Sequence, residues 1–193
     1  MRKSREGYCS WANSSEKYQI YHDNEWGLSE YNDKKLWEMF VLEGFQAGLS
    51  WIIILNKREN FREAFDNFDP KKISNYGLMD IEKLLKNKGI VRNRTKINAT
   101  INNSKLYNQI FSKNGSFSDF LWCFVDGKPI VNHIKGLSDI QSQTELSIMI
   151  SKEFKRLGFK FCGPTIMYAF MQAVGIVNDH ITTCPRYFEC QKG

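Results

Sequence analysis

The sequence contains no long apolar run and no low-complexity segment. Its longest apolar stretch runs from Trp51 to Leu55, far short of the roughly 18 residues that a membrane-spanning helix needs. The first eight residues, MRKSREGY, lack the apolar segment of a secretory signal peptide. We therefore expect a cytoplasmic protein with no membrane partner.

Cysteine is too scattered to form a disulfide framework. The chain has an odd number of cysteines, namely Cys9, Cys123, Cys162, Cys184 and Cys190. In a reducing cytosol such residues are buried thiols, metal ligands or nucleophiles. Neither Cys123 nor Cys162 has a histidine close in sequence, so we expect both to be inert core thiols.

Helical signals dominate what is present. In 193 residues, 42% hydrophobic and 14% aromatic, there is enough apolar surface for one core, and no stretch shows the sustained alternation of a strand. Start and stop residues predict about eight short helices, at roughly 33–47, 51–65, 80–88, 92–113, 118–125, 144–157 and 164–174, with one more short helix that begins at Asp69-Pro70. Residues 126–143 are predicted to be a surface connection. We expect a single all-α unit over residues 1–193, with two helical lobes.

Positive charge is concentrated in one segment. From Lys83 to Ser118 the sequence has eight Lys or Arg residues and no Asp or Glu, which exceeds the formal net charge of +6 for the whole chain. Such a field suits a phosphate backbone. A solvated lysine-rich surface explains the same pattern about as well.

Two Cys/His pairs lie at opposite ends of the chain. Cys9 and His22 form one pair, and His180 and Cys184 form the other at i, i+4 spacing, which places both side chains on one face of a helix or tight turn. Two thiolates and two imidazoles can make a closed structural Zn²⁺ site. Buried thiols with hydrogen-bonded histidines are the alternative. His133, the third histidine, is assigned no role.

Glu43 falls on an apolar helical stripe with Leu36, Phe40 and Ala47. A carboxylate there must find a partner or stay protonated, and such groups often recognise ligands or act in catalysis. Gly44 beside it implies a close approach of backbone or ligand. A glutamate paired with arginine or facing a surface groove is the alternative.

Aromatic residues and a glycine-bounded turn complete the candidate features. Nearby in sequence are the aromatics Trp11, Tyr18, Tyr21, Trp26, Phe45 and Trp51, which could stack on a base or simply belong to the core. The segment 157–165, LGFKFCGPT, joins two predicted helices, and its free N–H groups could bind a phosphate. Basic residues surround it: Lys152, Lys155, Arg156 and Lys160.

Five stretches in order resemble the type I DNA-3-methyladenine glycosylases of the helix-hairpin-helix superfamily. They are YHDNEWG from Tyr21, LEGFQAGLSW from Leu42, KREN from Lys57, GIVRNR from Gly89, and the segment running from GFKF at Gly158 through FMQA to VNDH ending at His180. Together they cover nearly the whole chain from Cys9 to Cys184. Phe45 and Asn93 depart from the family pattern, which commonly has Gln and His at these positions.

The resemblance implies an enzyme that flips 3-methyladenine out of duplex DNA and hydrolyses its N-glycosidic bond. It implies a structural zinc, one per chain, on Cys9, His22, His180 and Cys184. Glu43 would recognise the base, with Tyr21 and Trp51, and less strongly Trp11 and Trp26, as pocket aromatics. Gly48 and Leu49 would fill the gap that the flipped base leaves, and the hairpin, through Gly158, Lys160, Gly163 and Thr165, would grip the DNA backbone. The resemblance also implies a monomer with no obligate protein partner.

The chemistry agrees with these side chains. Methylation at N3 makes the adenine cationic, so the base leaves easily and Glu43 can discriminate by stabilising charge. Many superfamily members place an Asp about twenty residues after the hairpin's last glycine, a position that this sequence and the type I family lack. With no lysine there as a nucleophile, we expect a monofunctional enzyme without lyase activity. A zinc-stabilised DNA-binding module without catalysis is the runner-up, and a metallohydrolase would need an open zinc position.

Overall fold

The computed structural model describes residues 5–191, apart from the side chains of residues 112–114. Over that range the chain is mostly helical, as expected. The first elements are the 3-10 helix η1 (Ser10–Ser14) and the helices α1 (Glu16–Asn24), α2 (Asp33–Gln46) and α3 (Trp51–Ala64). The 3-10 helix η2 (Asp66–Phe68) and the helices α4 (Pro70–Ile73), α5 (Leu78–Lys86) and α6 (Arg94–Asn114) follow.

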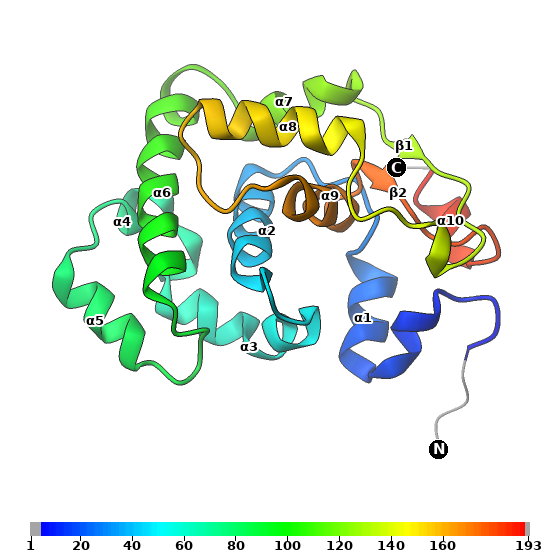
Figure 1. Ribbon diagram of the computed structural model, residues 1–193, viewed down its shortest axis with the longest axis horizontal. Helices are drawn as coiled ribbons and strands as arrows, with labels where there is room; N and C mark the ends of the chain where they lie inside the picture. The colour runs from blue at the N-terminus through cyan, green and yellow to red at the C-terminus, as the bar shows by residue number, and fades with distance from the viewer. Residues whose placement is uncertain (1–4, 192–193) are drawn as a thin grey trace.

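The second half of the chain contains shorter elements. It contains α7 (Phe117–Trp122), η3 (Cys123–Val125), β1 (Ile130–Val131), η4 (Leu137–Asp139), α8 (Glu145–Arg156), α9 (Pro164–Ala173), β2 (Val177–Asn178) and α10 (Pro185–Glu189). In Figure 1, α2 and α9 lie at the centre, α6 and α8 lie on the outside, and α1 lies on the same side as α10. Within residues 5–191, no helix is both long and apolar enough to cross a membrane.

The predicted helices from α2 onward agree with the structure to within about two residues at most ends. The Asn32 side chain accepts the Lys34 and Lys35 N–H groups at the start of α2, as a side-chain cap should. Pro70 and Pro164 begin their helices at the first turn, where a missing N–H costs nothing. Local signals therefore set most of these boundaries.

Two helices and one connection differ from the prediction. α1 and α10 were missed because they are short and few of their side chains are buried, which leaves no clear apolar period. The predicted surface connection 126–143 is wrong in part, since Ile130 and Val131 pair in parallel with Val177 and Asn178. An isolated parallel bridge between Ile134 and Ile181 extends this contact. Residues 126–143 thus help to fix the C-terminal segment.

One hydrophobic cluster runs through the described residues from Cys9 to Cys184. The rings of Phe40, Phe117, Phe154 and Phe170 meet at its centre, with centroids about 5–6 Å apart. Because α2 carries Phe40 on this side and is buried almost all round, its position is held by packing from several elements. A rigid α2 provides a fixed base for Glu43.

Candidate active site and candidate metal centre

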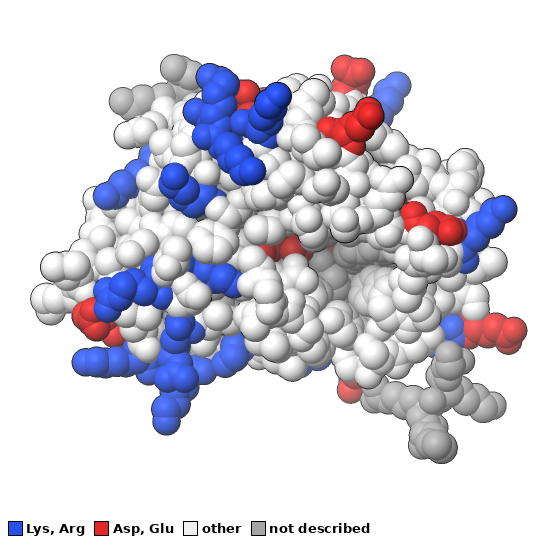
Figure 2. Space-filling view, viewed as in Figure 1, with Lys and Arg blue, Asp and Glu red and all other residues white. Residues whose placement is uncertain are grey.

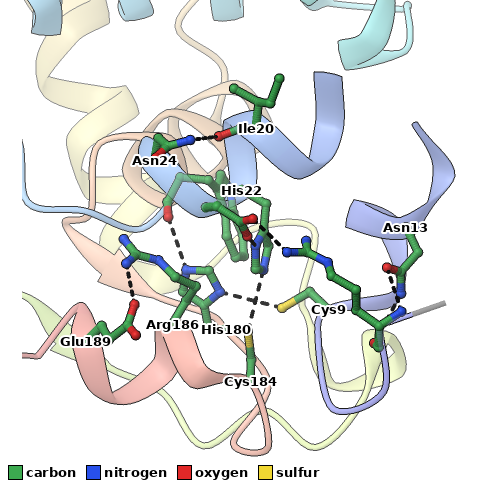
Figure 3. A network of polar contacts seen from close by, with 12 residues as sticks. Cys9, Asn13, Ile20, His22, Asn24, His180, Cys184, Arg186 and Glu189 are labelled. Carbon is green, nitrogen blue, oxygen red and sulfur yellow. Dashed lines mark hydrogen bonds and ion pairs between the residues drawn. The ribbon is translucent and has the colours of Figure 1, made fainter. Parts of the chain in front are cut away.

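The two Cys/His pairs predicted from the sequence meet in space. The Cys9 Sγ lies 3.6 Å from the His180 Nδ1, and the Cys184 Sγ lies 3.6 Å from the His22 Nε2. The four ligand atoms all lie within 4.8 Å of one another, and all four residues are buried. Figure 3 shows the side chains pointing toward one another from the N-terminal and C-terminal segments.

Two S···N distances in the cluster match those around a tetrahedral zinc ion. Zn–S bonds of about 2.3 Å and Zn–N bonds of about 2.0–2.1 Å place sulfur and nitrogen roughly 3.6 Å apart on the edge of a tetrahedron. Both measured S···N distances have this value. The proximity of the two thiols lowers the pKa of Cys184 and raises that of Cys9. Two cysteine and two histidine side chains are a donor set that Zn²⁺ commonly takes in structural sites.

Both histidines are oriented by contacts on their other ring nitrogen. The His22 Nδ1 lies 2.8 Å from a carboxylate oxygen of Asp23, and that carboxylate in turn accepts from Arg5 at 2.6 Å. The His180 Nε2 lies 3.1 Å from the carbonyl oxygen of Trp26. Metal-ligating histidines usually have such partners, which fix the tautomer. These contacts give each imidazole an oriented nitrogen toward the cluster.

Glu43 is buried on α2, with 3% of its surface exposed. Its Oε2 atom is buried and has no hydrogen-bond partner among the described residues. Burial raises the pKa of Glu43 to about 8. A carboxyl group held without a partner is costly to fold, and a catalytic or ligand-binding role is one of the reasons for which native structures keep such groups. The alternative in which Glu43 pairs with an arginine is therefore wrong.

The predicted pocket aromatics form a continuous chain of ring contacts. Tyr21 lies 5.5 Å from Trp51 and 6.4 Å from Trp11, and Trp11 lies 5.0 Å from Trp26, measured between ring centroids. Burial and then the nearby charge of Glu43 raise the pKa of Tyr21. The Trp51 Nε1 is buried and has no partner within the described part of the chain. A buried carboxylate oxygen and a buried indole N–H are thus both available to a ligand.

The surface is hollowed near these elements. Figure 2 shows a hollow between α1 and the central helix α2, and acidic atoms are visible at its edge. Tyr21 comes from α1, Glu43 from α2 and Trp51 from the first residue of α3. Three separate helices therefore converge on the region where a planar ligand could be held.

The same aromatic chain reaches the Cys/His cluster. The Trp11 ring lies 5.3 Å from His22, and the Trp26 ring lies 4.7 Å from His180. Trp26 is buried and Trp11 is partly buried. The two weaker pocket candidates thus pack directly on the predicted metal ligands, and Trp26 is as much a part of that cluster as of the pocket.

The predicted DNA-contacting residues lie on two turns. Gly48 and Leu49 are exposed in the turn between α2 and α3. Gly48 has a φ of +78° and open space around it. In the hairpin between α8 and α9, Lys160 and Thr165 are exposed, and Gly158 adopts a φ of +94°. Gly163 is the N-cap residue of α9.

Gly44 explains how close the hairpin approaches α2. A Cβ built at Gly44 would lie 3.4 Å from the Cβ of Phe161 and 3.8 Å from its carbonyl oxygen. The close approach predicted at this glycine is therefore confirmed, and the approaching group is the hairpin. Phe45, which departs from the family pattern, packs into the core with its ring 4.8 Å from Phe61.

The basic segment is largely exposed, with one exception. Lys83, Lys86, Lys88 and Arg92 are exposed, and Figure 2 shows basic side chains gathered over α5, the start of α6 and the end of α8. Lys113 lies outside the described side chains. Lys96 is buried, with 7% of its surface exposed, and its Nζ donates to carbonyls at the end of α2. Counting it as a surface charge was wrong, because the chain folds α2 against it.

An ion network beneath the aromatics was not predicted. Arg58 on α3 donates from Nε to Glu38 on α2 at 2.7 Å, and from a terminal nitrogen to Glu25 after α1 at 2.5 Å. Arg62 also donates to Glu38, at 2.6 Å. The network joins the three helices that carry Tyr21, Glu43 and Trp51. Arg58 belongs to the KREN stretch that resembles the family, and this stretch was the only feature of the sequence that pointed to it.

Asp179 is a structural hub. Tyr168 and Gln172 donate to its Oδ2 at 2.6 and 2.7 Å, and Asn132 donates to its Oδ1 at 2.6 Å. With both oxygens occupied and 1% of its surface exposed, this carboxylate holds β1, α9 and the segment before His180 together.

Of the remaining thiols, Cys162 and Cys190 are buried, but Cys123 is exposed, so its placement in the core was wrong.

Comparison with known proteins identifies relatives over nearly the full length. The sequence pattern of the methyladenine glycosylase family matches residues 11–187. A DNA-3-methyladenine glycosylase of Haemophilus influenzae is 47% identical over 92% of this chain and 96% of its own. A crystal structure of 3-methyladenine DNA glycosylase I superposes with a TM-score of 0.90 at 48% identity, covering 92% of this chain and 98% of that one. The Staphylococcus aureus enzyme, whose structure addresses 3-methyladenine recognition, superposes with a TM-score of 0.88 at 37% identity, covering 92% and 94%.

Proposed function

Because this chain belongs to the methyladenine glycosylase family, we propose that it removes 3-methyladenine from alkylated duplex DNA. The relatives named above act as DNA-3-methyladenine glycosylases. The observation that supports the same activity here is the buried Glu43 carboxyl, whose Oε2 lacks a partner among the described residues. Glu43 is also close enough for its charge to raise the pKa of Tyr21. A binding protein without a base pocket would have no use for such a group.

The reaction is hydrolysis of an N-glycosidic bond. The enzyme flips the methylated nucleotide into its pocket, and the bond between the sugar C1′ and the base nitrogen breaks. Water supplies the hydroxyl that remains on the sugar, and its other proton is released to the solvent. The methylated base carries a positive charge and leaves with the bonding electrons as a neutral molecule. No strong general acid is needed, so binding and orientation carry most of the catalysis.

Glu43 is proposed to recognise the lesion. As a carboxylate it accepts N–H groups of the methylated adenine and stabilises its positive charge, which an unmethylated adenine does not offer. The faces of Tyr21 and Trp51, with centroids 5.5 Å apart, provide aromatic surface for a cationic ring. The pocket therefore selects by both charge and shape. An ordinary base is rejected because it brings no positive charge to pair with the buried Glu43 carboxylate.

The Cys/His cluster is proposed to hold one structural Zn²⁺. Cys9, His22, His180 and Cys184 are the four ligands, and when bound the ion would tie the N-terminal segment to the C-terminal one. Four protein ligands leave no position for an activated water, so the metallohydrolase reading is not favoured. Hydrolysis is proposed to depend on the pocket residues, without a lyase step, in a monomeric protein.

The runner-up is a DNA-binding module of the same fold without catalysis. It would keep the hairpin and the basic surface but would not need an unpaired carboxylate oxygen and an unpaired indole N–H in the interior. Both groups cost folding free energy unless a ligand engages them. Their presence favours the enzyme.

The test is to incubate the protein with methylated duplex DNA and to chromatograph the released bases. We expect 3-methyladenine to be released in excess over 7-methylguanine. Similar rates for the two bases would contradict the substrate assignment, and no release at all would support the non-catalytic module. Glu43→Gln should weaken binding of free 3-methyladenine while the circular dichroism spectrum stays unchanged.

A further inference from the structure

We propose that Lys96 is a positioning residue for base extrusion, which holds the end of α2 so that the Gly48–Leu49 turn and the hairpin keep a fixed separation. This inference rests on the proposed function. It adds a role for a residue that the sequence pattern placed on the basic surface. The argument starts from the contacts of the Lys96 ammonium group.

Lys96 caps the C-terminal end of α2. Its Nζ donates to the carbonyl oxygen of Phe45 at 2.8 Å and to that of Ala47 at 2.6 Å. The last carbonyls of a helix have no partner within the helix, and they carry partial negative charge that favours a cation. Ala47 is the C-cap residue of α2, directly before Gly48. The ammonium group therefore fixes the backbone where the turn begins.

The turn itself is exposed. Gly48 has a φ of +78° and nothing within 4 Å of a Cβ built on it, and Leu49 is 37% exposed. A backbone hydrogen bond, from the Leu49 N–H to the Gln46 carbonyl at 2.7 Å, closes the turn. A side chain that must enter a DNA duplex has to be exposed, so its position depends on what holds its base. Lys96 supplies that hold.

The same helix holds the hairpin. Asn103 lies seven residues after Lys96 on α6, about 10 Å along the helix axis. Its side-chain oxygen accepts the Lys160 N–H at 2.8 Å, and its amide nitrogen donates to the Lys160 carbonyl at 2.9 Å. Both backbone groups of Lys160 are thus bound by one buried side chain. α6 therefore contacts both DNA-facing segments. Lys96, near its start, binds the backbone before the Gly48–Leu49 turn, and Asn103, two helical turns later, binds the hairpin.

α2 and the hairpin, which both contact α6, also contact each other directly. Phe161 has a left-handed φ of +53°, an unfavourable conformation for an aromatic residue, and its Cβ meets the Gly44 position. The ring of Phe161 lies 5.9 Å from the Lys96 Nζ. α2, the hairpin and α6 therefore meet around Lys96, and loss of its ammonium would release the end of α2 first.

A buried lysine is an expensive way to cap a helix, because its burial disfavours the charged form and lowers the pKa of Lys96. Water or a neutral side chain can satisfy helix ends without burying a charge. Retaining a buried cation is reasonable where the backbone must not move. If the turn inserts Leu49 while the hairpin grips the phosphate backbone, the distance between the two decides whether the base is pushed out.

The test compares Lys96→Met with wild type on three substrates. Two substrates are duplexes with one adenine in one strand, which is methylated before annealing. In the first duplex this adenine lies opposite thymine, and in the second it lies opposite an abasic-site analogue. The third is free 3-methyladenine, whose affinity is measured by tryptophan fluorescence. Lys34→Met is the matched control, because Lys34 is an exposed cation at the start of the same helix and its loss changes the net charge equally.

We expect Lys96→Met to release 3-methyladenine from the thymine-paired duplex at least tenfold more slowly in single turnover. Release opposite the abasic analogue, where no paired base must be separated, should fall less than threefold, and the Kd for the free base should change less than twofold. Lys34→Met should match wild type in all three. Equal losses on both duplexes, a matching loss of free-base affinity, or no loss at all would overturn the proposal.

If Lys96→Met is not folded by circular dichroism, Lys96→Gln, which keeps one amide donor, must show the same separation between the two duplexes. The inference and the proposed function fail separately. A wild-type protein that releases no base contradicts the proposed function. An active wild-type protein together with an unselective Lys96 variant contradicts only the role of Lys96.

Discussion

Glu38 and Glu43 lie five residues apart on α2, and the pKa values of their carboxyl groups are shifted in opposite directions. Both are buried, and burial raises the pKa of each. At Glu38, hydrogen bonds and charges from Arg62 and Arg58 outweigh burial and lower the pKa below its ordinary value. At Glu43 burial acts alone and raises the pKa to about 8. Glu38 is thus a structural anion, whereas Glu43 is protonated below about pH 8 in the free protein.

The first prediction concerns the pH dependence of activity. Below its pKa of about 8 Glu43 is protonated in the free enzyme, so only a fraction can accept N–H groups as a carboxylate. We expect kcat/KM to rise about tenfold per pH unit toward pH 8 and then to level off, since kcat/KM reports the free enzyme. Glu43→Gln should show a low, flat profile. A flat profile for wild type would remove Glu43 as the titrating group.

A second prediction concerns stability without ligand. Because the pKa of Glu43 is higher in the folded state than in the unfolded chain, the folded state binds more protons between about pH 4.5 and pH 8. Stability from this group is present at low pH and is lost as pH rises through that window. Glu43→Gln should therefore be more stable than wild type by a few kcal/mol at pH 9, and similar to it at pH 4.5.

Urea unfolding of both proteins at the two pH values measures this difference. Glu145→Gln, at an exposed position on α8, is the matched control and should follow wild type at both pH values. A Glu43→Gln protein that is less stable at pH 9 would show that Glu43 has a structural partner.

The third prediction concerns the Arg58 network. Arg58→Met leaves Glu25 without its arginine and leaves Glu38 with Arg62 alone, so the free energy of unfolding should fall by about 2–4 kcal/mol. Because Arg58 connects the three helices that carry the pocket residues, affinity for free 3-methyladenine should also fall several-fold. Arg156→Met removes an exposed pair with Glu153 and should cost less than about 1 kcal/mol. Unchanged base affinity in a destabilised Arg58→Met protein would refute a positioning role.

The fourth prediction concerns Gly27. Its φ is +78°, and a Cβ there would lie 2.8 Å from the His180 Nε2. Gly27→Ala should therefore displace His180, with a lower melting temperature and weaker metal retention. Gly48→Ala is a close control because its φ is also +78° but the space around it is open. That control should pay only the cost of the left-handed conformation, about 1–2 kcal/mol. Equal effects in the two variants would show that His180 can move freely.

The fifth prediction concerns the metal. Cys9→Ser should lower both the zinc content of the purified protein and its melting temperature, because three ligands bind the ion less tightly than four. Cys123→Ser changes an exposed thiol and should leave both quantities unchanged. Metal content is measured by mass spectrometry on protein purified without added zinc. A full equivalent of zinc in the Cys9→Ser protein would refute the ligand set.

Much of the architecture could be predicted because the signals are local. The cap at Asn32, the prolines at 70 and 164, and the spacing of Glu43 on an apolar stripe each depend on a few neighbouring residues. The meeting of Cys9 with His180 was predicted from residue type, since the donor set is complete only when the two ends combine.

What was missed depends on tertiary contacts. Nothing in the sequence around Lys96 distinguishes it from the exposed basic residues near it, because its burial is set by the end of α2, some fifty positions away. Arg58 is similar, since its two partners lie on other helices. α1 was missed because Tyr21 and His22 are its only buried residues, so its packing has no repeating pattern to detect.

The Cys/His cluster also sets the order in which this molecule can be completed. Its contacts join residues 171 and 162 positions apart, so the loop that it closes includes nearly the entire chain. The entropic cost of loop closure rises only with the logarithm of loop length, so even so distant a connection adds little to it. The connection cannot form until Cys184 has been synthesised. A chain that stops earlier leaves Cys9 and His22 without their partners, so closure of the cluster distinguishes finished molecules from unfinished ones.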